Sequence, residues 1–272
     1  MLTGLVLSLA AGLLLEGCRG PTRPAVAVGG EAPGSALGIV VESGVLQSQT
    51  GCDFDYDLYR PAGMTSSAQV VLAHGFLRSR ERMQGLARAL AEAGFVTVAI
   101  DLCNMRPWDG AHELNAADMR LTARSLGSAG VVYAGFSAGG LAALLAASGD
   151  PHSHGVVVLD LVDQDDLGRR AAVALDKPVS GLFGRRSRCN ANGNGLVVLA
   201  DAVDAKVEQF DNATHCDFES PTDDLCRLLC EPSGRDPDEA AVVRARLITS
   251  AVAAVQRVSQ LARRSPVATP VD

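Results

Sequence analysis

Short apolar runs alternate with amphipathic stretches along most of the chain, which predicts strands alternating with helices. The run "QVVLAHGF" at 69–76 predicts a buried strand that ends in a glycine turn. The stretch 79–94 that follows carries Met83, Leu86 and Leu90 at the spacing of one helix face. Further strands are predicted at 95–100, 131–136, 155–161, 177–184 and 206–215, and further helices at 116–126 with Asn115 as the cap, after Ser137, and from Asp236 onward.

This alternation predicts the fold class. Regular β–α repetition is typical of an α/β protein with a doubly wound, mostly parallel sheet and helices on both faces. The earlier segment 44–63 has no intervening helix, so it predicts an antiparallel hairpin at one edge of the sheet. Because no internal repeat or long insertion interrupts the pattern, we expect one domain over residues 38–265.

The beginning of the chain has the pattern of an export signal. Residues 2–15 are apolar, too few to cross a bilayer as a helix but of signal-peptide length, and "LEGC" at 15–18 resembles the lipobox of bacterial lipoproteins. We therefore expect a signal peptide over 1–18, lipidation of Cys18 and membrane attachment through it. An ordinary secretory signal that is cut elsewhere is the alternative. Either one predicts export, as a bacterial cell-envelope lipoprotein or as a secreted protein.

Two further segments lack hydrophobic periodicity. Residues 19–37 are rich in Pro, Gly and Ala, a composition that predicts a flexible linker. Residues 266–272 read "PVATPVD" and predict a disordered tail. Neither segment is expected to contribute to the folded domain.

Composition, charge and cysteine count indicate which partners and bonds to expect. The chain has 272 residues, 47% of them hydrophobic, and its net charge of −7 argues against a nucleic-acid partner. Six of its seven cysteines follow Cys18, and an even number in an exported protein predicts disulfides, with 15 alternative pairings. No C-x-x-C pair occurs, so we expect no structural zinc. The four aspartates within 160–166 do not have the spacing of a calcium-binding loop, so we expect no other metal site.

The segment "GFSAG" at 135–139 lies between a predicted strand and a predicted helix. Gly-x-Ser-x-Gly in that context is typical of a nucleophile elbow, a tight turn that raises the serine hydroxyl above the sheet. We therefore predict that Ser137 is a nucleophile and that the Ala138 amide faces a developing oxyanion. A serine without a catalytic role in a glycine-rich turn is the alternative.

The turn after the strand at 69–76 is expected to complete an oxyanion hole. His74, Gly75 and Phe76 follow that strand, and the Phe76 amide would act together with the Ala138 amide. His74 comes before the predicted nucleophile, whereas the order in this type of site is serine, acid, histidine. We therefore interpret His74 as a structural residue.

A general base is identified by elimination among five histidines. His215 alone follows Ser137 at the end of a late strand. His152 and His154 lie where a strand begins, at the opposite edge of the sheet, and His112 precedes the serine in a long loop. A serine hydroxyl needs an imidazole to accept its proton near neutral pH, so His215 is the predicted base.

The acid that would orient His215 has two candidates. No acidic residue occurs between Asp176 and Asp201, where a late loop would otherwise supply one. Asp160 ends the preceding predicted strand, and neighbouring strand ends lie only about 5 Å apart. Asp160 is therefore the predicted acid and Asp163 the alternative.

The motifs "AHGF", "GFSAGG", "LDLVD" and "ATHCDFESPTDDLCRLLC" occur in the order found in the chlorophyllase-like branch of the α/β-hydrolases. The chain resembles that branch over about residues 40–230 and is similar, more loosely, to cutinase-like polyester hydrolases. The resemblance implies a triad of Ser137, Asp160 and His215. Leu161 stands where the branch has proline, and Phe136 and Ala138 replace its histidine and arginine, which argues against chlorophyll as the substrate.

These observations predict a serine hydrolase that cleaves small or polymeric carboxylic esters through an acyl-enzyme, without a metal or organic cofactor. The usual place for a lid, between Leu161 and Lys177, is only about sixteen residues long, so no large lid is expected. Two alternatives use the same residues differently: a serine peptidase of the same fold, and a non-catalytic lipoprotein that binds at the cell surface.

Overall fold

The computed structural model describes residues 38–65, 69–104, 110–200 and 202–264 of the protein. These ranges cover nearly all of the domain predicted at 38–265. The predicted signal peptide at 1–18 with Cys18, the predicted linker 19–37 and the predicted tail 266–272 lie outside the described residues.

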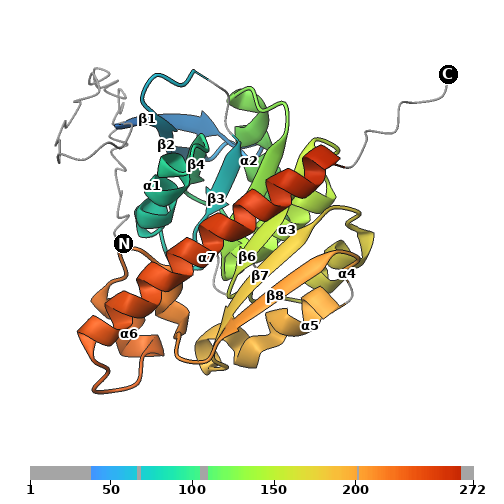
Figure 1. Ribbon diagram of the computed structural model, residues 1–272. Coiled ribbons are helices and arrows are strands. Elements are labelled where there is room, and N and C mark those ends of the chain that lie inside the picture. The colour runs from blue at the N-terminus through green and yellow to red at the C-terminus, as the bar shows by residue number, and fades with distance from the viewer. Residues whose placement is uncertain (1–37, 66–68, 105–109, 201, 265–272) are drawn as a thin grey trace, which may run out of the picture.

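Eight strands of the described chain form one mixed sheet in the order β1-β2-β4-β3-β5-β6-β7-β8 (Figure 1). β1 pairs with β2, and β2 with β4, in antiparallel fashion, and the other pairs are parallel. The predicted doubly wound sheet with an antiparallel N-terminal hairpin is confirmed. The strands are β1 (Ile39–Gln47), β2 (Asp53–Pro61), β3 (Val70–Ala73), β4 (Thr97–Ile100), β5 (Val131–Phe136), β6 (Ser153–Leu159), β7 (Val179–Gly184) and β8 (Ala205–Phe210).

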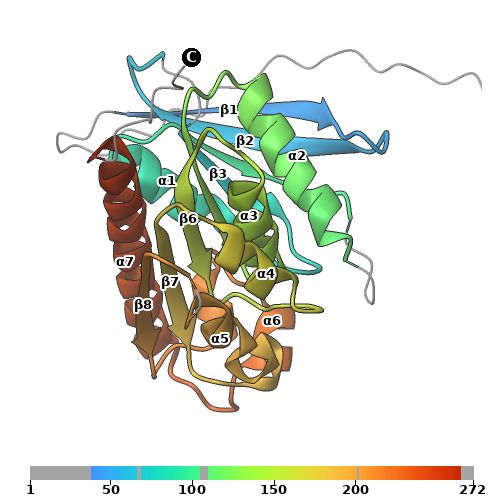
Figure 2. The ribbon, with the colours of Figure 1, turned by 90° about the vertical axis from the view of Figure 1, so that its right-hand side faces the viewer.

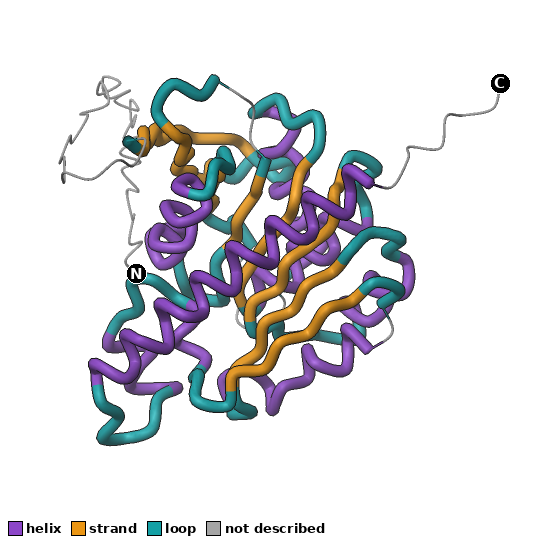
Figure 3. The backbone as a smooth tube through the Cα atoms, in the orientation of Figure 1, coloured by secondary structure: helices purple, strands orange, loops and turns teal. Residues whose placement is uncertain are grey.

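Helices cover both faces of the sheet. α1 and the long α7 lie on one face, and α2 to α5 lie on the other (Figure 2), so the strands run between two helical layers (Figure 3). α6 packs beside the segments that follow β7 and β8. No helix of the described ranges is both long and apolar enough to cross a membrane. The helices are α1 (Gln84–Glu92), α2 (His112–Ser125), α3 (Ala138–Ser148), α4 (Leu167–Ala174), α5 (Asn194–Ala200), α6 (Asp224–Cys230) and α7 (Pro237–Arg264).

The core explains why the central strands are apolar at every position. All six residues of β5 are buried, because successive side chains point into opposite helical layers. Val131 and Tyr133 pack with the α2–α5 layer, whereas Val132, Ala134 and Phe136 pack with α1 and α7. A strand covered on both faces therefore loses the alternation that marks a half-exposed strand.

Some local boundaries differ from the sequence expectation. α2 begins at His112, so Asn115 lies inside the helix and is not its cap. The Asn115 side chain instead bonds the backbone of Asn104 and Gly110 and holds the loop in front of the helix. Asp236 does cap α7, since its carboxylate accepts the Asp238 amide at 2.8 Å. The short helices α4, α5 and α6 were not individually predicted.

The six cysteines that follow Cys18 form three disulfides. Cys52–Cys103 joins the β1–β2 turn to the segment after β4. Cys189–Cys230 and Cys216–Cys226 both end on α6 and connect it to the segments after β7 and β8. The predicted disulfides are confirmed, and the structure supplies the pairing that the spacing left open.

One buried carboxyl group of α2 predicts a pH-dependent stability. Asp118 is buried, and its Oδ2 atom has no hydrogen-bond partner within the described chain. Burial raises the pKa of Asp118 to about 6, although a hydrogen bond with the Ser48 hydroxyl lowers that pKa in part. The folded state then binds more protons than the unfolded state between about pH 4 and pH 6, so the free energy of unfolding decreases as the pH rises through that window.

We predict that Asp118→Asn raises the midpoint of thermal unfolding by a few degrees at about pH 7.5 and changes it little at about pH 4, where the wild-type carboxyl is already neutral. Calorimetry at both pH values measures the difference. The exposed Asp165→Asn serves as the control and should leave both midpoints unchanged. The same change in midpoint for Asp118→Asn at both pH values would contradict the raised pKa of Asp118.

Candidate active site

The predicted site residues follow the carboxyl ends of different strands and meet at one edge of the sheet. Phe76 lies just after β3, Ser137 directly after β5, Asp160 directly after β6, and His215 in the segment after β8. The registers of β3, β5 and β6 align the ends of these strands. In a parallel α/β sheet this edge is where ligands bind.

Ser137 occupies a tight turn that requires small neighbours. Its backbone has φ 55° and ψ −119°, in a region that residues other than glycine seldom adopt. A Cβ atom at Gly135 would lie 2.1 Å from the Gly139 carbonyl oxygen, and one at Gly139 would lie 2.2 Å from the His74 carbonyl oxygen. Gly135 therefore lets the first turn of α3 lie against the end of β5, and Gly139 lets it lie against the segment after β3.

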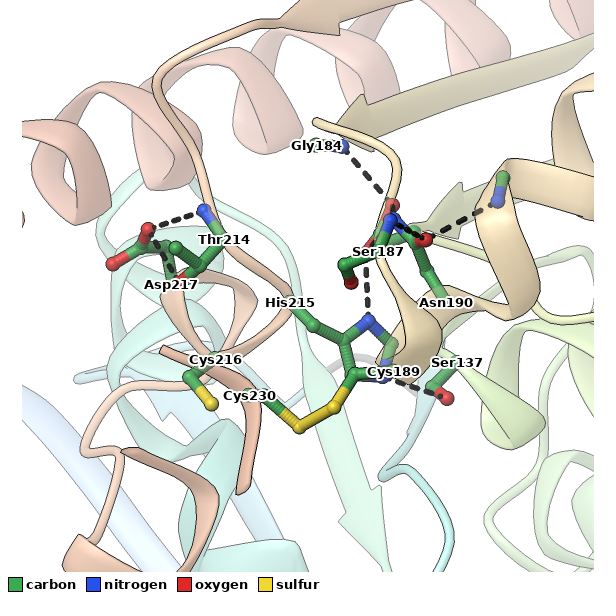
Figure 4. Close-up of polar contacts among 12 residues, drawn as sticks. Ser137, Gly184, Ser187, Cys189, Asn190, Thr214, His215, Cys216, Asp217 and Cys230 are labelled. Atoms are coloured by element: carbon green, nitrogen blue, oxygen red, sulfur yellow. Dashed lines mark hydrogen bonds and ion pairs between the residues drawn. A yellow bond between two sulfur atoms is a disulfide. The ribbon is translucent and has the colours of Figure 1, made fainter. Parts of the chain in front are cut away.

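The His215 ring points one of its nitrogens at Ser137 (Figure 4) and the other at Asp160. Its Nε2 atom is 3.1 Å from Ser137 Oγ, and its Nδ1 atom is 2.6 Å from Asp160 Oδ2. The turn before it is fixed by Asp217, whose carboxylate accepts hydrogen bonds from the Thr214 amide and hydroxyl. The structure thus joins a hydroxyl, an imidazole and a carboxylate in one hydrogen-bonded chain.

The Asp160 carboxylate is completely buried. Its Oδ1 atom accepts the Gly184 amide at 3.0 Å, and the Asn190 side chain donates to both carboxylate oxygens. Asp163, the alternative acid, instead accepts the amides of Gln164 and Gly168 at the start of α4. Of the two candidates, the structure brings only Asp160 to His215.

Two backbone amides are available next to Ser137. Within the described chain, neither the Phe76 nor the Ala138 amide donates to a protein acceptor. The Phe76 turn lies against the serine, since a Cβ atom at Gly75 would be 3.2 Å from Ser137 Cβ. Both amides can therefore donate to an oxygen that develops negative charge in front of the hydroxyl.

His74 holds the Phe76 turn in place. Its Nε2 atom accepts the Leu102 amide at 3.1 Å, so its proton is on Nδ1, which donates to the Gly75 carbonyl at 2.7 Å. Burial lowers the pKa of His74, which favours this neutral form. These contacts agree with the interpretation of His74 as a structural residue.

The other histidines and the clustered cysteines lie in different surroundings. His112 bonds Gln164 at the start of α2, and His152 and His154 lie where β6 begins. Among the described residues, Cys216, Cys226 and Cys230 gather their sulfur atoms as metal ligands would, but all three sulfurs belong to disulfides. A disulfide sulfur is not the thiolate that a metal requires.

A cavity of about 240 Å³ opens beside Ser137. Leu77, Leu225 and Leu229 line it and are 62%, 52% and 67% exposed, and we call these three residues the leucine rim. Phe76 lines the same cavity. The opening in front of the hydroxyl is therefore bordered by aliphatic and aromatic groups.

A buried ion pair forms the polar part of the cavity wall. Arg78 donates to both carboxylate oxygens of Glu219, at 2.5 and 2.8 Å, and also bonds Asp223 at 2.8 Å. Glu219 is fully buried and lies shortly after His215. The pair therefore joins the turn that carries Phe76 to the turn that carries His215.

Two residues that support the site were not predicted from the sequence. The Phe136 ring lies 4.6 Å from the His215 ring between centroids and packs against the imidazole. Asn190 contacts Asp160 from the segment after β7. The signal for Asn190 was weak: an asparagine-rich stretch in a loop where an acid was sought and none was found.

Comparison with known proteins identifies the fold. No protein-family model and no curated protein matches the chain. The solved structure of a ferulic acid esterase from Streptomyces cinnamoneus matches it with a TM-score of 0.61 at 17% identity, over 89% of this chain and 96% of that one. A dienelactone hydrolase from Anabaena variabilis matches with a TM-score of 0.55 at 21% identity, over 77% of this chain and 96% of that one. The chain has the α/β-hydrolase fold.

A third similar structure extends the comparison within the α/β-hydrolase fold. An acetyl xylan esterase from Paenibacillus sp. R4 matches with a TM-score of 0.54 at 13% identity, over 64% of this chain and 78% of that one. Identities this low show the fold alone. The narrower resemblance to the chlorophyllase-like and cutinase-like branches of the α/β-hydrolases therefore stays a prediction.

The packing of the serine turn predicts that the stability of the protein depends strongly on its two glycines. We predict that Gly135→Ala or Gly139→Ala lowers the free energy of unfolding by about 1–3 kcal/mol or more, because the new methyl group meets backbone atoms that cannot rotate away. Gly140→Ala is the control, since its Cβ atom would lie 3.1 Å from the Gly135 carbonyl oxygen and 3.4 Å from Leu161. Urea denaturation measures all three variants, and equal losses would refute the prediction.

Proposed function

We propose that the protein is a carboxylic ester hydrolase that works through an acyl-enzyme on Ser137. The observation that carries the proposal is the hydrogen-bonded chain from Ser137 Oγ through His215 to the buried Asp160 carboxylate. A serine hydroxyl becomes a competent nucleophile when an imidazole accepts its proton, and a buried carboxylate holds that imidazole in the correct tautomer.

In the first step, Ser137 Oγ attacks the carbonyl carbon of the ester while its proton moves to His215 Nε2. The carbonyl oxygen becomes an oxyanion that accepts hydrogen bonds from the Phe76 and Ala138 amides. Asp160 stabilises the imidazolium formed at His215. The tetrahedral intermediate collapses when the bond to the leaving oxygen breaks and His215 returns its proton to that oxygen, which releases the alcohol.

In the second step, water takes the place of the alcohol. His215 accepts a proton from the water as its oxygen attacks the acyl carbon, and the same two amides bind the second oxyanion. Breaking the bond to Ser137 Oγ releases the carboxylic acid, and His215 returns the proton to the serine. Each proton removed in the cycle is returned by the same nitrogen, so these residues suffice for hydrolysis.

The similar structures support an ester as the substrate class. The solved proteins with this fold include a ferulic acid esterase and an acetyl xylan esterase. The apolar cavity and the leucine rim favour an ester with a bulky or long aliphatic part, because such a group would displace water from these side chains. The segment between β6 and β7 holds only the eight-residue α4, so this segment supplies no large cover for the cavity.

We also propose that the protein is exported. The three disulfides support this proposal, because such bonds form and persist mainly in oxidising compartments. Membrane attachment through lipidated Cys18 is part of the same proposal and rests on the sequence pattern at 15–18.

Removing single members of the hydrogen-bonded chain tests the proposed function. We predict that Ser137→Ala abolishes covalent labelling by a fluorophosphonate probe, and that Ser137→Ala and His215→Ala each lower kcat/KM for para-nitrophenyl esters by about 10³-fold or more. Labelling is read by mass spectrometry of the intact chain and of its peptides, and hydrolysis by absorbance.

The controls change the same residue types elsewhere. Ser148→Ala lies at the end of α3 and His152→Ala is exposed before β6, so both should keep wild-type labelling and hydrolysis. Labelling that persists in Ser137→Ala would refute the assignment of the nucleophile. Faster hydrolysis of a matched amide than of the ester would make the protein a peptidase.

The leucine rim predicts a selective loss of long-chain substrates. We predict that the double variant Leu225→Ser/Leu229→Ser raises KM for an octanoyl ester by about 3- to 10-fold and leaves an acetyl ester unchanged, because the acetyl group is too short to contact the rim. The exposed Val242→Ser on α7 is the control. A wild-type enzyme that prefers the acetyl ester, or a variant equally impaired on both esters, would refute this substrate preference.

A further inference from the structure

Asn190 is a buried polar residue next to the hydrogen-bonded chain of Ser137, His215 and Asp160. It is 1% exposed and lies in the segment that follows β7, three residues after Ser187. Figure 4 shows Asn190 and Ser187 above the His215 ring and Ser137 at its lower right. The proposed mechanism uses no group of Asn190, so its burial at this place needs another explanation.

The orientation of the Asn190 amide is fixed by its partners. Its Oδ1 atom accepts the backbone amides of Ser187 at 2.8 Å and Gly193 at 3.2 Å. A backbone N–H group can only donate, so the oxygen must face these two residues and the nitrogen must face away from them. The nitrogen donates to the Arg185 carbonyl at 2.9 Å, and its other hydrogen is directed at Asp160.

That second hydrogen is shared between both oxygens of the Asp160 carboxylate. The distances from Asn190 Nδ2 are 3.3 Å to Oδ1 and 3.2 Å to Oδ2. The Gly184 amide bonds only Oδ1, so it leaves the carboxylate free to turn about that contact. A donor that spans both oxygens fixes the plane of the group and directs Oδ2 at His215 Nδ1.

We propose that Asn190 is a positioning residue that holds the Asp160 carboxylate oriented toward His215. The inference rests on the proposed function, because it gives Asn190 a part in the reaction only through Asp160 and His215. A fully buried carboxylate is stable as an anion only when donors satisfy its oxygens. Asn190 supplies a neutral donor, which stabilises the anion without cancelling the charge that His215 needs as a partner.

The backbone around Asn190 is held in a costly conformation. Ala191 and Asn192 follow it with φ 47° and φ 55°, two consecutive residues in the left-handed region. Cys189, immediately before it, is bonded to Cys230 on α6. Strained residues of this kind persist only where surrounding contacts determine them, and here they bring the Asn190 amide to Asp160.

A double-mutant cycle tests whether Asn190 acts through Asp160. We predict that Asn190→Ala lowers the rate of Ser137 labelling by a fluorophosphonate, and kcat for esters, by about 10- to 100-fold, as expected for a lost hydrogen bond to a charged group. In the Asp160→Ala background the same change should lower neither rate further, because the group on which Asn190 acts is already absent. KM should change little in either background.

A second variant keeps the inference testable where the alanine variant unfolds. Asn190→Asp preserves the shape and the Oδ1 acceptor, but its other oxygen donates to Asp160 only while the two carboxyls share a proton. Activity of Asn190→Asp should therefore decrease with rising pH over a range in which the wild type has reached its plateau. Among the described residues, Asp160 is the titratable side chain that Asn190 contacts, and His215 is bonded to Asp160 in turn. The arginines of the same segment, Arg185, Arg186 and Arg188, are exposed.

The matched control is Asn192→Asp, the same change at an exposed position of the same segment, which should keep the wild-type pH profile. A role confined to folding would give additive losses in the cycle and a wild-type profile in Asn190→Asp, and either result overturns the inference. A wild-type protein that is not labelled at Ser137 would instead refute the proposed function, so the two failures are distinguishable.

Discussion

The burial of one carboxylate is the constraint on which the arrangement of the site depends. An ionised carboxyl group removed from water is stable only if its oxygens accept hydrogen bonds, and Asp160 is completely buried. Its donors are Gly184, Asn190 and His215, which come from the end of β7 and from the segments after β7 and β8. These hydrogen bonds satisfy the oxygens of the carboxylate, and the one to His215 also directs the imidazole toward Ser137. The stability of the buried carboxylate and the geometry of the site therefore have the same physical cause.

The segments that carry the site are also joined to one another. The Arg78–Glu219 pair connects the turn of Phe76 with the turn of His215. The disulfides Cys189–Cys230 and Cys216–Cys226 connect the segments after β7 and β8 to α6. The segment between β6 and β7 supplies no large lid that could order the site by closing over the substrate, so other contacts must order the loops. Cross-links between loops provide that order, and they place the leucine rim at the cavity as part of the same rigid unit.

The sequence was informative where structure follows from local rules. β-branched runs and glycine turns located the strands, the two glycines at 135 and 139 located the serine turn, and the position of His215 after a late strand distinguished it from the other histidines. Asn190 and the disulfide pairing could not be predicted, because each depends on segments brought together only by the sheet order. The short helices α4 to α6 have at most eight residues, about two turns, which is too short for a periodic pattern to distinguish them from loops. Asn115 shows the opposite failure: a good capping residue whose side chain instead bonds the loop in front of the helix.

The position of the acid at the end of β6 determines what the segment after β7 can contain. A carboxylate at position 190 would lie about 3 Å from another carboxylate in a water-excluded place, and two such groups do not both ionise. A lysine or arginine would neutralise Asp160 and weaken its effect on the imidazolium. A neutral amide avoids both outcomes, because it donates a hydrogen bond without adding charge. An acid already present one strand earlier therefore favours a neutral donor at position 190, within a segment that has no acidic residue between Asp176 and Asp201.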